Sequence, residues 1–309
     1  MAKIAGDGDY ASGSDPGYAG RNGRLSDCQP HRDSHSSFSY LLHRQITSNL
    51  HLTWSIPESA ASTSGWRNYH ADSSQSFLPC AADHGWLKSF HTFSFASYRN
   101  PNEQGFSDLL VINDDRVTAG KGFGQHPHRD MEIFSYVLEG ALEHKDTLGT
   151  GSVIRPGDVQ LMSAGSGVAH SEFNHSQTEG VHFLQIWIVP NVSGATPKYQ
   201  QEHFSPEQKR GRLQLIISPD GENGALNVRQ DARVYAGLFD GSETATLELA
   251  ANRYAYVHVA RGSVVLNGQA LGEGDGVRLR DEQVITLTEG VNAEVLVFDL
   301  RPNELPQMP

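Results

Sequence analysis

Four side chains in the middle of the sequence have types and a spacing that suit a metal ion. His126 and His128 are two residues apart, and His170 and Glu172 repeat the spacing further along the chain. In a β-strand, residues i and i+2 project from one face with their Cα atoms roughly 6–7 Å apart. Two neighbouring strands would therefore direct three imidazoles and one carboxylate to one point. A lone His-x-His pattern is common, but two such pairs in Gly-rich surroundings predict a metal site.

This donor set indicates a catalytic metal rather than a structural one. Three neutral nitrogens and one carboxylate oxygen suit divalent first-row ions such as Fe, Mn, Ni, Cu or Co. A structural zinc site more often uses Cys and closes its tetrahedron, whereas a catalytic site keeps positions open for substrate. The donor set does not fix the ion, because most divalent metals accept it and availability decides.

Strands must position these side chains, and the sequence from Phe77 onward has an all-β texture. Short runs rich in Val, Ile, Phe and Tyr alternate with Gly, Pro, Asn and Asp turns about every ten residues. Amphipathic helices are scarce, and the best candidate is Ser205–Arg212. Regular short strands without interleaved helices favour sandwiches or barrels over an α/β sheet. The expected strands are Ser89–Ala96, Leu109–Ile112, Glu132–Leu138, Val159–Met162, Phe183–Val189, Leu213–Ile217, Tyr254–Val259, Ser263–Leu266, Gly276–Leu279, Gln283–Leu287 and Glu294–Asp299.

The 309 residues divide into three predicted parts. Residues 1–76 are rich in Ser and Gly without apolar periodicity, so we expect a disordered or low-complexity extension. The two halves of the remaining sequence are loosely similar, since in Tyr136–Gly140 and in His258–Gly262 a Gly directly follows a predicted strand. We therefore expect a duplicated barrel, with a metal-binding domain at 77–195 and a metal-free domain at 196–309.

The ligand pairs lie within two recognisable motifs. Gly120-x5-His126-x-His128-x3-Glu132, which ends at Gly140, resembles the first cupin signature. Gly157-x5-Ser163-Ala-Gly165-x4-His170-x3-Asn174 resembles the second, with Ser163 in place of the usual Pro. Together with the segments HPHRDMEI, YVLEG, MSAGSGVAHSE, LQIWI and HTFSFASY, these motifs resemble the pirin family, and most closely the bacterial pirin-like quercetin 2,3-dioxygenases.

The resemblance implies a fold, a cofactor and an activity. The fold would be two cupin (jelly-roll-like) barrels with one divalent metal per chain, bound by His126, His128, His170 and Glu172. Iron is the expected ion, and Cu, Mn, Ni, Co or Zn are alternatives. The activity would be that of an oxidoreductase, a quercetinase that opens the central ring of flavonols with O2 and releases CO. Another aromatic enol is the alternative substrate to quercetin.

Further roles follow from position and chemistry. Glu172 is the single carboxylate among the proposed ligands, so it is the candidate catalytic residue that takes the substrate proton. Glu132 is expected in the second shell, and Asn174 and His182 are candidate second-shell donors. His258 stands alone in its strand and is expected to be a core or surface histidine. Candidate pocket side chains are Phe93, Phe95, Phe123, Met131, Phe134, Phe173 and Trp187.

The alternative function is non-enzymatic, a metal-binding pirin that acts as a redox-sensing regulator of a protein partner. Lys and Arg total 24 against 36 Asp and Glu, a formal charge of −12, which argues against a broad basic surface for direct nucleic-acid binding. Apolar runs fall far short of the 18 or more residues of a membrane span. Without a secretory signal or a disulfide framework, a cytoplasmic location is expected.

Overall fold

The computed structural model describes residues 80–304, and nearly all of its regular structure is β-strand. The expectation of an all-β chain is confirmed. The predicted disordered extension at 1–76 lies outside the described residues. Across 80–304, no helix has the length and apolar character to cross a bilayer.

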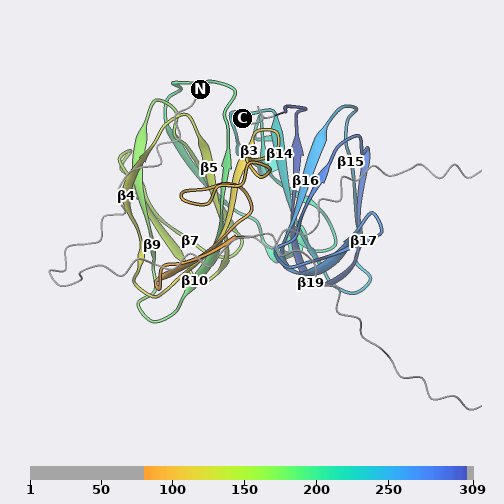
Figure 1. Ribbon diagram of the computed structural model, residues 1–309, viewed down its shortest axis with the longest axis horizontal. Coiled ribbons are helices and arrows are strands. Elements are labelled where there is room, and N and C mark those ends of the chain that lie inside the picture. Colours follow the sequence, from red (N-terminus) through yellow and green to blue (C-terminus); the bar gives the residue numbers. More distant parts are fainter. Residues whose placement is uncertain (1–79, 305–309) are drawn as a thin grey trace, which may run out of the picture. The chain divides into compact units, whose positions relative to one another are not determined.

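The first half forms two sheets, drawn in orange to green in Figure 1. The larger sheet has the strand order β1-β2-β3-β10-β5-β8-β11, and the smaller has the order β4-β9-β6-β7. The larger sheet contains β1 (Cys80–Asp83), β2 (Leu87–His91), β3 (Leu109–Val117), β5 (Glu132–Glu139), β8 (Asp158–Ser163), β10 (Val181–Ile188) and β11 (Lys198–His203). The smaller sheet contains β4 (Gly122–His128), β6 (Leu142–Asp146), β7 (Gly151–Ile154) and β9 (Val168–Asn174).

The second half forms one eight-stranded sheet, cyan to blue in Figure 1. Its main path runs β13-β12-β14-β19-β16-β17, while β15 pairs with β19 and β18 with β16. The strands are β12 (Gln214–Ser218), β13 (Leu226–Asn227), β14 (Ala232–Phe239), β15 (Ala245–Glu248), β16 (Tyr254–Leu266), β17 (Gln269–Gly272), β18 (Gly276–Leu279) and β19 (Val284–Leu300). A short helix α1 (Pro206–Lys209) and a 3-10 turn η1 (Glu222–Gly224) complete the elements.

Three sequence expectations need correction in detail. The segments Tyr254–Val259 and Ser263–Leu266 form one strand, β16, because its pairing with β19 continues through register shifts around Gly262. Gly262 has φ 66°, so it bends the strand instead of ending it. The helix expected over Ser205–Arg212 is only four residues long. Finally, the boundary at 195/196 would place β11 in the second barrel, whereas β11 pairs with β8 of the first.

Strand β5 has buried side chains on both faces, which explains its nearly continuous apolar composition. Phe134 and Tyr136 share one hydrophobic cluster with Tyr256, Leu296 and Phe298 of the second half. The alternate residues of β5 therefore face the interior of the first barrel. One strand thus connects the barrel interior with the packing between the two halves.

A buried polar network crosses the same packing region. The Tyr136 hydroxyl donates to Glu294 Oε1 at 2.6 Å, and Lys209 Nζ donates to the Tyr136 oxygen at 2.9 Å. The Lys209 side chain also lies 3.3 Å from Glu294 and is 4% exposed. Burial of a charged pair is tolerated only when its hydrogen-bonding groups are satisfied, so the tyrosine hydroxyl completes this network.

Tyr136→Phe should destabilise the protein because it leaves the buried Glu294 carboxylate without its tyrosine donor. We expect a loss of about 1–3 kcal/mol in the free energy of unfolding, measured by urea denaturation. Tyr254→Phe is the matched control, since its hydroxyl donates to the exposed Glu304 at the same 2.6 Å. Equal losses in the two variants would contradict a role for burial.

Candidate metal centre

Two neighbouring strands of the smaller sheet, β4 and β9, carry the candidate ligands, and β6 pairs with β9 on its other side. In β9, His170 lies opposite His126 of β4 on one side and opposite Asp146 of β6 on the other. Glu172 lies opposite His144 in the same way. Side chains directly opposite in an antiparallel pair have Cβ atoms roughly 4.5–5.5 Å apart. The register alone therefore gathers the ligand pairs on one face.

The three predicted histidine ligands form a tight group. The ring centroids of His126 and His170 are 4.5 Å apart, and His128 lies 4.8 Å from His126 and 4.9 Å from His170. One ligating nitrogen from each ring lies within 4.8 Å of the other two. This spacing is suited to a single ion held between the three rings.

The imidazoles offer free nitrogens in the neutral form. His126 Nδ1 donates to the Gly124 carbonyl at 2.8 Å, which leaves Nε2 with its lone pair. His128 Nε2 and His170 Nε2 are buried and have no hydrogen-bond partner among the described residues. Burial, with a smaller contribution from His126, lowers the pKa of His128 to about 3, and burial lowers the pKa of His170 further. The residues thus fit a divalent metal.

Glu172 is held from the opposite sheet. Ser135 Oγ donates to Oε1 at 3.1 Å, and Gln185 Nε2 donates to Oε2 at 2.9 Å. Burial raises the pKa of the Glu172 carboxyl, while the histidines and these hydrogen bonds oppose the shift. The carboxylate belongs to a second ligand-competent group, with His144 and His170, that shares His170 with the first.

His144 and Asp146 were missed by the sequence reasoning. Their His-x-Asp spacing in β6 matches the i, i+2 spacing of the two recognised pairs, so the pattern was available as a signal. His144 has no exposed surface, and its Nε2 lies 3.0 Å from Asp146 Oδ2. Its Nδ1 lies 3.4 Å from His170 Nδ1. The third pair therefore contacts the ligand group directly.

The expected second-shell residues lie elsewhere. The Glu132 carboxylate faces away from the barrel interior, where it accepts hydrogen bonds from Ser163 and from the Arg229 backbone. Asn174 binds backbone carbonyls of Val117 and Glu179, and His182 binds Asp114. These expectations were wrong, because none of the three residues hydrogen-bonds to a candidate ligand in the described part of the chain. For Glu132 the reason is strand parity, which places it on the opposite face from Ser135. Hydrogen bonds to the candidate ligands come instead from Gly124, Ser135, His144 and Gln185.

Two of the candidate pocket aromatics lie beside the histidines. Trp187 packs edge-on against His128 with centroids 5.0 Å apart, and Phe95 packs against Trp187 at 5.4 Å. The buried Trp187 Nε1 has no partner in the described part of the chain. Phe93 and Phe134 belong to the main hydrophobic core instead, and Phe173 is 39% exposed.

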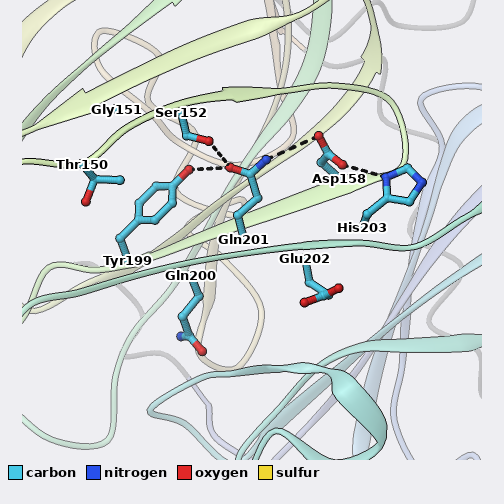
Figure 2. A pocket seen from close by; sticks show the side chains of 9 residues that line it. All are labelled: Thr150, Gly151, Ser152, Asp158, Tyr199, Gln200, Gln201, Glu202 and His203. Atoms are coloured by element: carbon cyan, nitrogen blue, oxygen red, sulfur yellow. Dashed lines mark hydrogen bonds and ion pairs between the residues drawn. The ribbon is translucent and has the colours of Figure 1, made fainter.

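On its other side, His144 packs against a tyrosine that lines a surface pocket. The centroids of His144 and Tyr199 are 4.8 Å apart. Tyr199 and Ser152 both donate to Gln201 Oε1 in this pocket of about 500 Å³, as Figure 2 shows. Burial raises the pKa of the Tyr199 hydroxyl to about 12, so it remains a donor.

The fold consists of two cupin barrels, and the first barrel contains the histidine cluster that is suited to a metal ion. Comparison with known families agrees, since residues 73–188 match the family described as Pirin and residues 215–300 match the Quercetinase C-terminal cupin domain. The prediction of two cupin barrels is confirmed. His258, which is buried in β16, belongs to neither ligand group.

Individual relatives are similar over nearly their whole length. The chain is 48% identical to the quercetin 2,3-dioxygenase of Escherichia coli K12 over 221 residues, which cover 72% of this chain and 94% of the relative. It is 42% identical to the Pirin-like protein of Caulobacter vibrioides, over 71% of this chain and 94% of the relative. The structure of E. coli YhhW matches with a TM-score of 0.70 at 46% identity, covering 74% of this chain and 96% of YhhW. YhhW in complex with nickel(II) matches with a TM-score of 0.69 at 47% identity, covering 72% and 96%.

The chain therefore belongs to the pirin family. The prediction of an oxidoreductase similar to quercetin 2,3-dioxygenases is confirmed by these relatives.

A buried acid near the centre gives the stability a testable pH dependence. Asp115 is 3% exposed, and burial raises the pKa of its carboxyl to about 7, with Asp114 and Glu172 acting in the same direction and Ser89 opposing. Between pH about 4 and 7 the native state holds a proton that the unfolded chain has lost. The stability contributed by protonated Asp115 therefore falls as pH rises through this window.

Asp115→Asn does not titrate, so its stability relative to the wild type should increase by about 2–4 kcal/mol between pH 4 and pH 8. The measurement is urea unfolding of the metal-free proteins at both pH values. Asp281→Asn, at an exposed turn, controls for the loss of one negative charge. A difference between Asp115→Asn and wild type that does not change with pH would contradict the assignment.

Proposed function

We propose that this chain is a metal-dependent dioxygenase of the pirin type that opens the central ring of flavonols such as quercetin with O2. The observation that carries the proposal is the group of His126, His128 and His170 inside the first barrel, which shares His170 with a second group that contains Glu172. The 48% identity to a quercetin 2,3-dioxygenase supports the substrate class. The proposed reaction adds one O2 to the flavonol, breaks two C–C bonds, and yields CO and a depside.

The proposed ligands are His126, His128, His170 and Glu172, which would hold one divalent ion per chain. When bound, such an ion supplies Lewis-acid and redox chemistry toward the enol and O2. Iron is the expected ion, and the nickel(II) complex of the E. coli relative supports nickel as an alternative. The neutral histidines offer lone pairs without adding charge, so the carboxylate provides the one negative charge of the set.

The proposed base is Glu172, which would accept the proton of the flavonol 3-hydroxyl. Burial raises the pKa of this carboxyl, and a raised pKa makes a carboxylate a better proton acceptor at neutral pH. Ser135 and Gln185 hold the two oxygens from the opposite sheet, so the group needs no reorganisation to act. Trp187 and Phe95 supply aromatic surface beside His128 for a planar substrate.

In this proposal the protein acts in the cytoplasm on a small molecule and needs no nucleic acid. Loss of the flavonol absorbance tests it, in metal-loaded protein with Fe, Cu, Mn, Ni or Co under O2. Parallel detection of CO distinguishes ring opening from simple oxidation. No loss of quercetin with any of these ions would favour the alternative of a redox-sensing metal-binding protein.

Removal of a histidine ligand should weaken metal binding strongly. His126→Ala and His128→Ala each delete one neutral nitrogen from the group, so the metal Kd should rise by more than the roughly 10–100-fold typical of supporting residues. The measurement is metal content after dialysis against a weak chelator. His258→Ala, a buried histidine of the second barrel, should keep wild-type occupancy. Full occupancy in both ligand variants would move the site elsewhere.

Glu172→Gln separates the roles of ligand and base. Gln keeps the shape and one carbonyl oxygen but loses the charge and the ability to accept a proton. We expect that excess metal refills the site without restoring turnover at neutral pH. Raising the pH, which ionises the substrate in solution, should then recover part of the rate. Glu179→Gln, on the exposed surface of the same barrel, is the charge control. Wild-type turnover of the metal-saturated variant at neutral pH would refute the base role.

A further inference from the structure

The third pair of inward side chains, His144 and Asp146, has no role in the function proposed above. Neither side chain has any exposed surface. Both lie on β6 beside β9, where Asp146 is the register partner of His170. A buried polar pair costs free energy unless each of its donors and acceptors has a hydrogen-bond partner. The positions of the hydrogens on this pair can therefore be assigned from its contacts.

The first contacts fix the orientation of the Asp146 carboxylate. Its Oδ1 accepts hydrogen bonds from the backbone N–H groups of Leu148 at 2.8 Å and Thr150 at 3.0 Å. Its Oδ2 lies 3.0 Å from His144 Nε2. An ionised carboxylate only accepts, so His144 Nε2 carries the hydrogen. In the neutral imidazole the other nitrogen, Nδ1, then carries a lone pair.

The contact between His144 and His170 then determines which nitrogen of His170 carries the hydrogen. His144 Nδ1 lies 3.4 Å from His170 Nδ1, and of two facing nitrogens one must donate and the other accept. Because His144 Nδ1 is the acceptor, His170 Nδ1 is the donor. The lone pair of His170 is thereby placed on Nε2, the buried nitrogen without a partner.

We propose that Asp146 and His144 form a relay of hydrogen bonds that sets the tautomer of His170 and so presents its Nε2 to the metal. The inference deepens the proposed function, since it rests on His170 as a metal ligand. In this proposal both residues are positioning residues, because they act on the metal through His170. Tyr199 supports the relay by packing against the outer side of the His144 ring, 4.8 Å between centroids.

His126 reaches the same result by a simpler route. Its Nδ1 donates to the Gly124 carbonyl at 2.8 Å, and a carbonyl oxygen can only accept. The tautomer of His126 is therefore fixed by backbone. His170 instead depends on two side chains in sequence, so a single substitution can reverse the direction of its hydrogen bonds.

Asp146→Asn is that substitution. The backbone N–H groups of Leu148 and Thr150 continue to donate hydrogen bonds to the Oδ1 atom of residue 146. The amide nitrogen of the Asn side chain is therefore directed at His144 Nε2. His144 Nε2 must then accept, His144 Nδ1 must donate, and His170 must carry its hydrogen on Nε2. Nitrogen-15 NMR of the metal-free full chain should show His170 change from the Nδ1–H to the Nε2–H tautomer. The Kd for Ni²⁺, titrated into metal-stripped protein, should rise roughly 10–100-fold.

Glu143→Gln is the matched control. Glu143 precedes His144 in the same strand, projects from the opposite face and pairs with the exposed His175 at 3.1 Å. It removes the same charge from β6, and it should leave the His170 tautomer and the Ni²⁺ Kd unchanged. An equal loss of affinity in Glu143→Gln would overturn the relay in favour of a general charge effect.

A pair of substitutions at His144 separates the relay from simple packing. In His144→Asn the amide oxygen takes the place of Nδ1 and can still accept from His170, whereas His144→Leu has no acceptor. The Ni²⁺ Kd should stay within about threefold of wild type in the Asn variant and rise roughly 10–100-fold in the Leu variant. Equal affinities in the two variants, or an unchanged His170 tautomer in Asp146→Asn, would overturn the proposal. Quercetin turnover enters none of these measurements, so the relay can fail while the dioxygenase proposal holds, and the reverse.

Discussion

The register of β9 between β4 and β6 is the constraint on which the metal centre depends. It places His126 and Asp146 on either side of His170, and His144 beside Glu172. A slip of one residue in either pairing would turn the inward side chains of that strand to the outer face. At Gly122, the first residue of β4, a Cβ would lie 2.3 Å from the Glu172 carbonyl oxygen. Only glycine therefore permits the close approach of β4 to β9 at this position. The site is thus a property of strand pairing before it is a property of any single ligand.

The second barrel supports the site without contributing to it. It packs on the outer face of the larger sheet, where Tyr136 of β5 meets Glu294 and Lys209. Ser135, the next residue in β5, points the other way and binds Glu172. Neighbouring residues of a strand project to opposite faces. The packing that fixes the position of Tyr136 therefore also fixes the position of Ser135 relative to the Glu172 carboxylate. This explains how a barrel whose histidine His258 joins neither ligand group can still matter to the chemistry.

The sequence predicts the site residues that recur at short spacing within one strand. It does not predict contacts that depend on which strands are neighbours in the sheet. The pairs at His126 and His170 follow from i, i+2 parity, and the all-β class follows from the turn signals. The support for Glu172 from Ser135 and Gln185 comes across the barrel, from strands distant in sequence. Glu132 was misplaced for the same reason, since parity within β5 has no meaning until one face is known to be inward. Long bent strands such as β16 were read as two, because a glycine that ends one strand can bend another.

Two of the three candidate histidine ligands, His126 and His170, differ from His258 in the hydrogen bond at the second ring nitrogen. His126 Nδ1 donates to the Gly124 carbonyl, and in the proposed relay His170 Nδ1 donates to His144 Nδ1. His258 is as deeply buried as His170, and burial lowers its pKa to about 4, yet neither of its nitrogens has a partner within the described residues. A ring without a fixed acceptor has no preferred tautomer, and in β16 it also lacks a second ligand at i+2. The acceptors in β4 and β6 decide which ring nitrogen of His126 and of His170 is free.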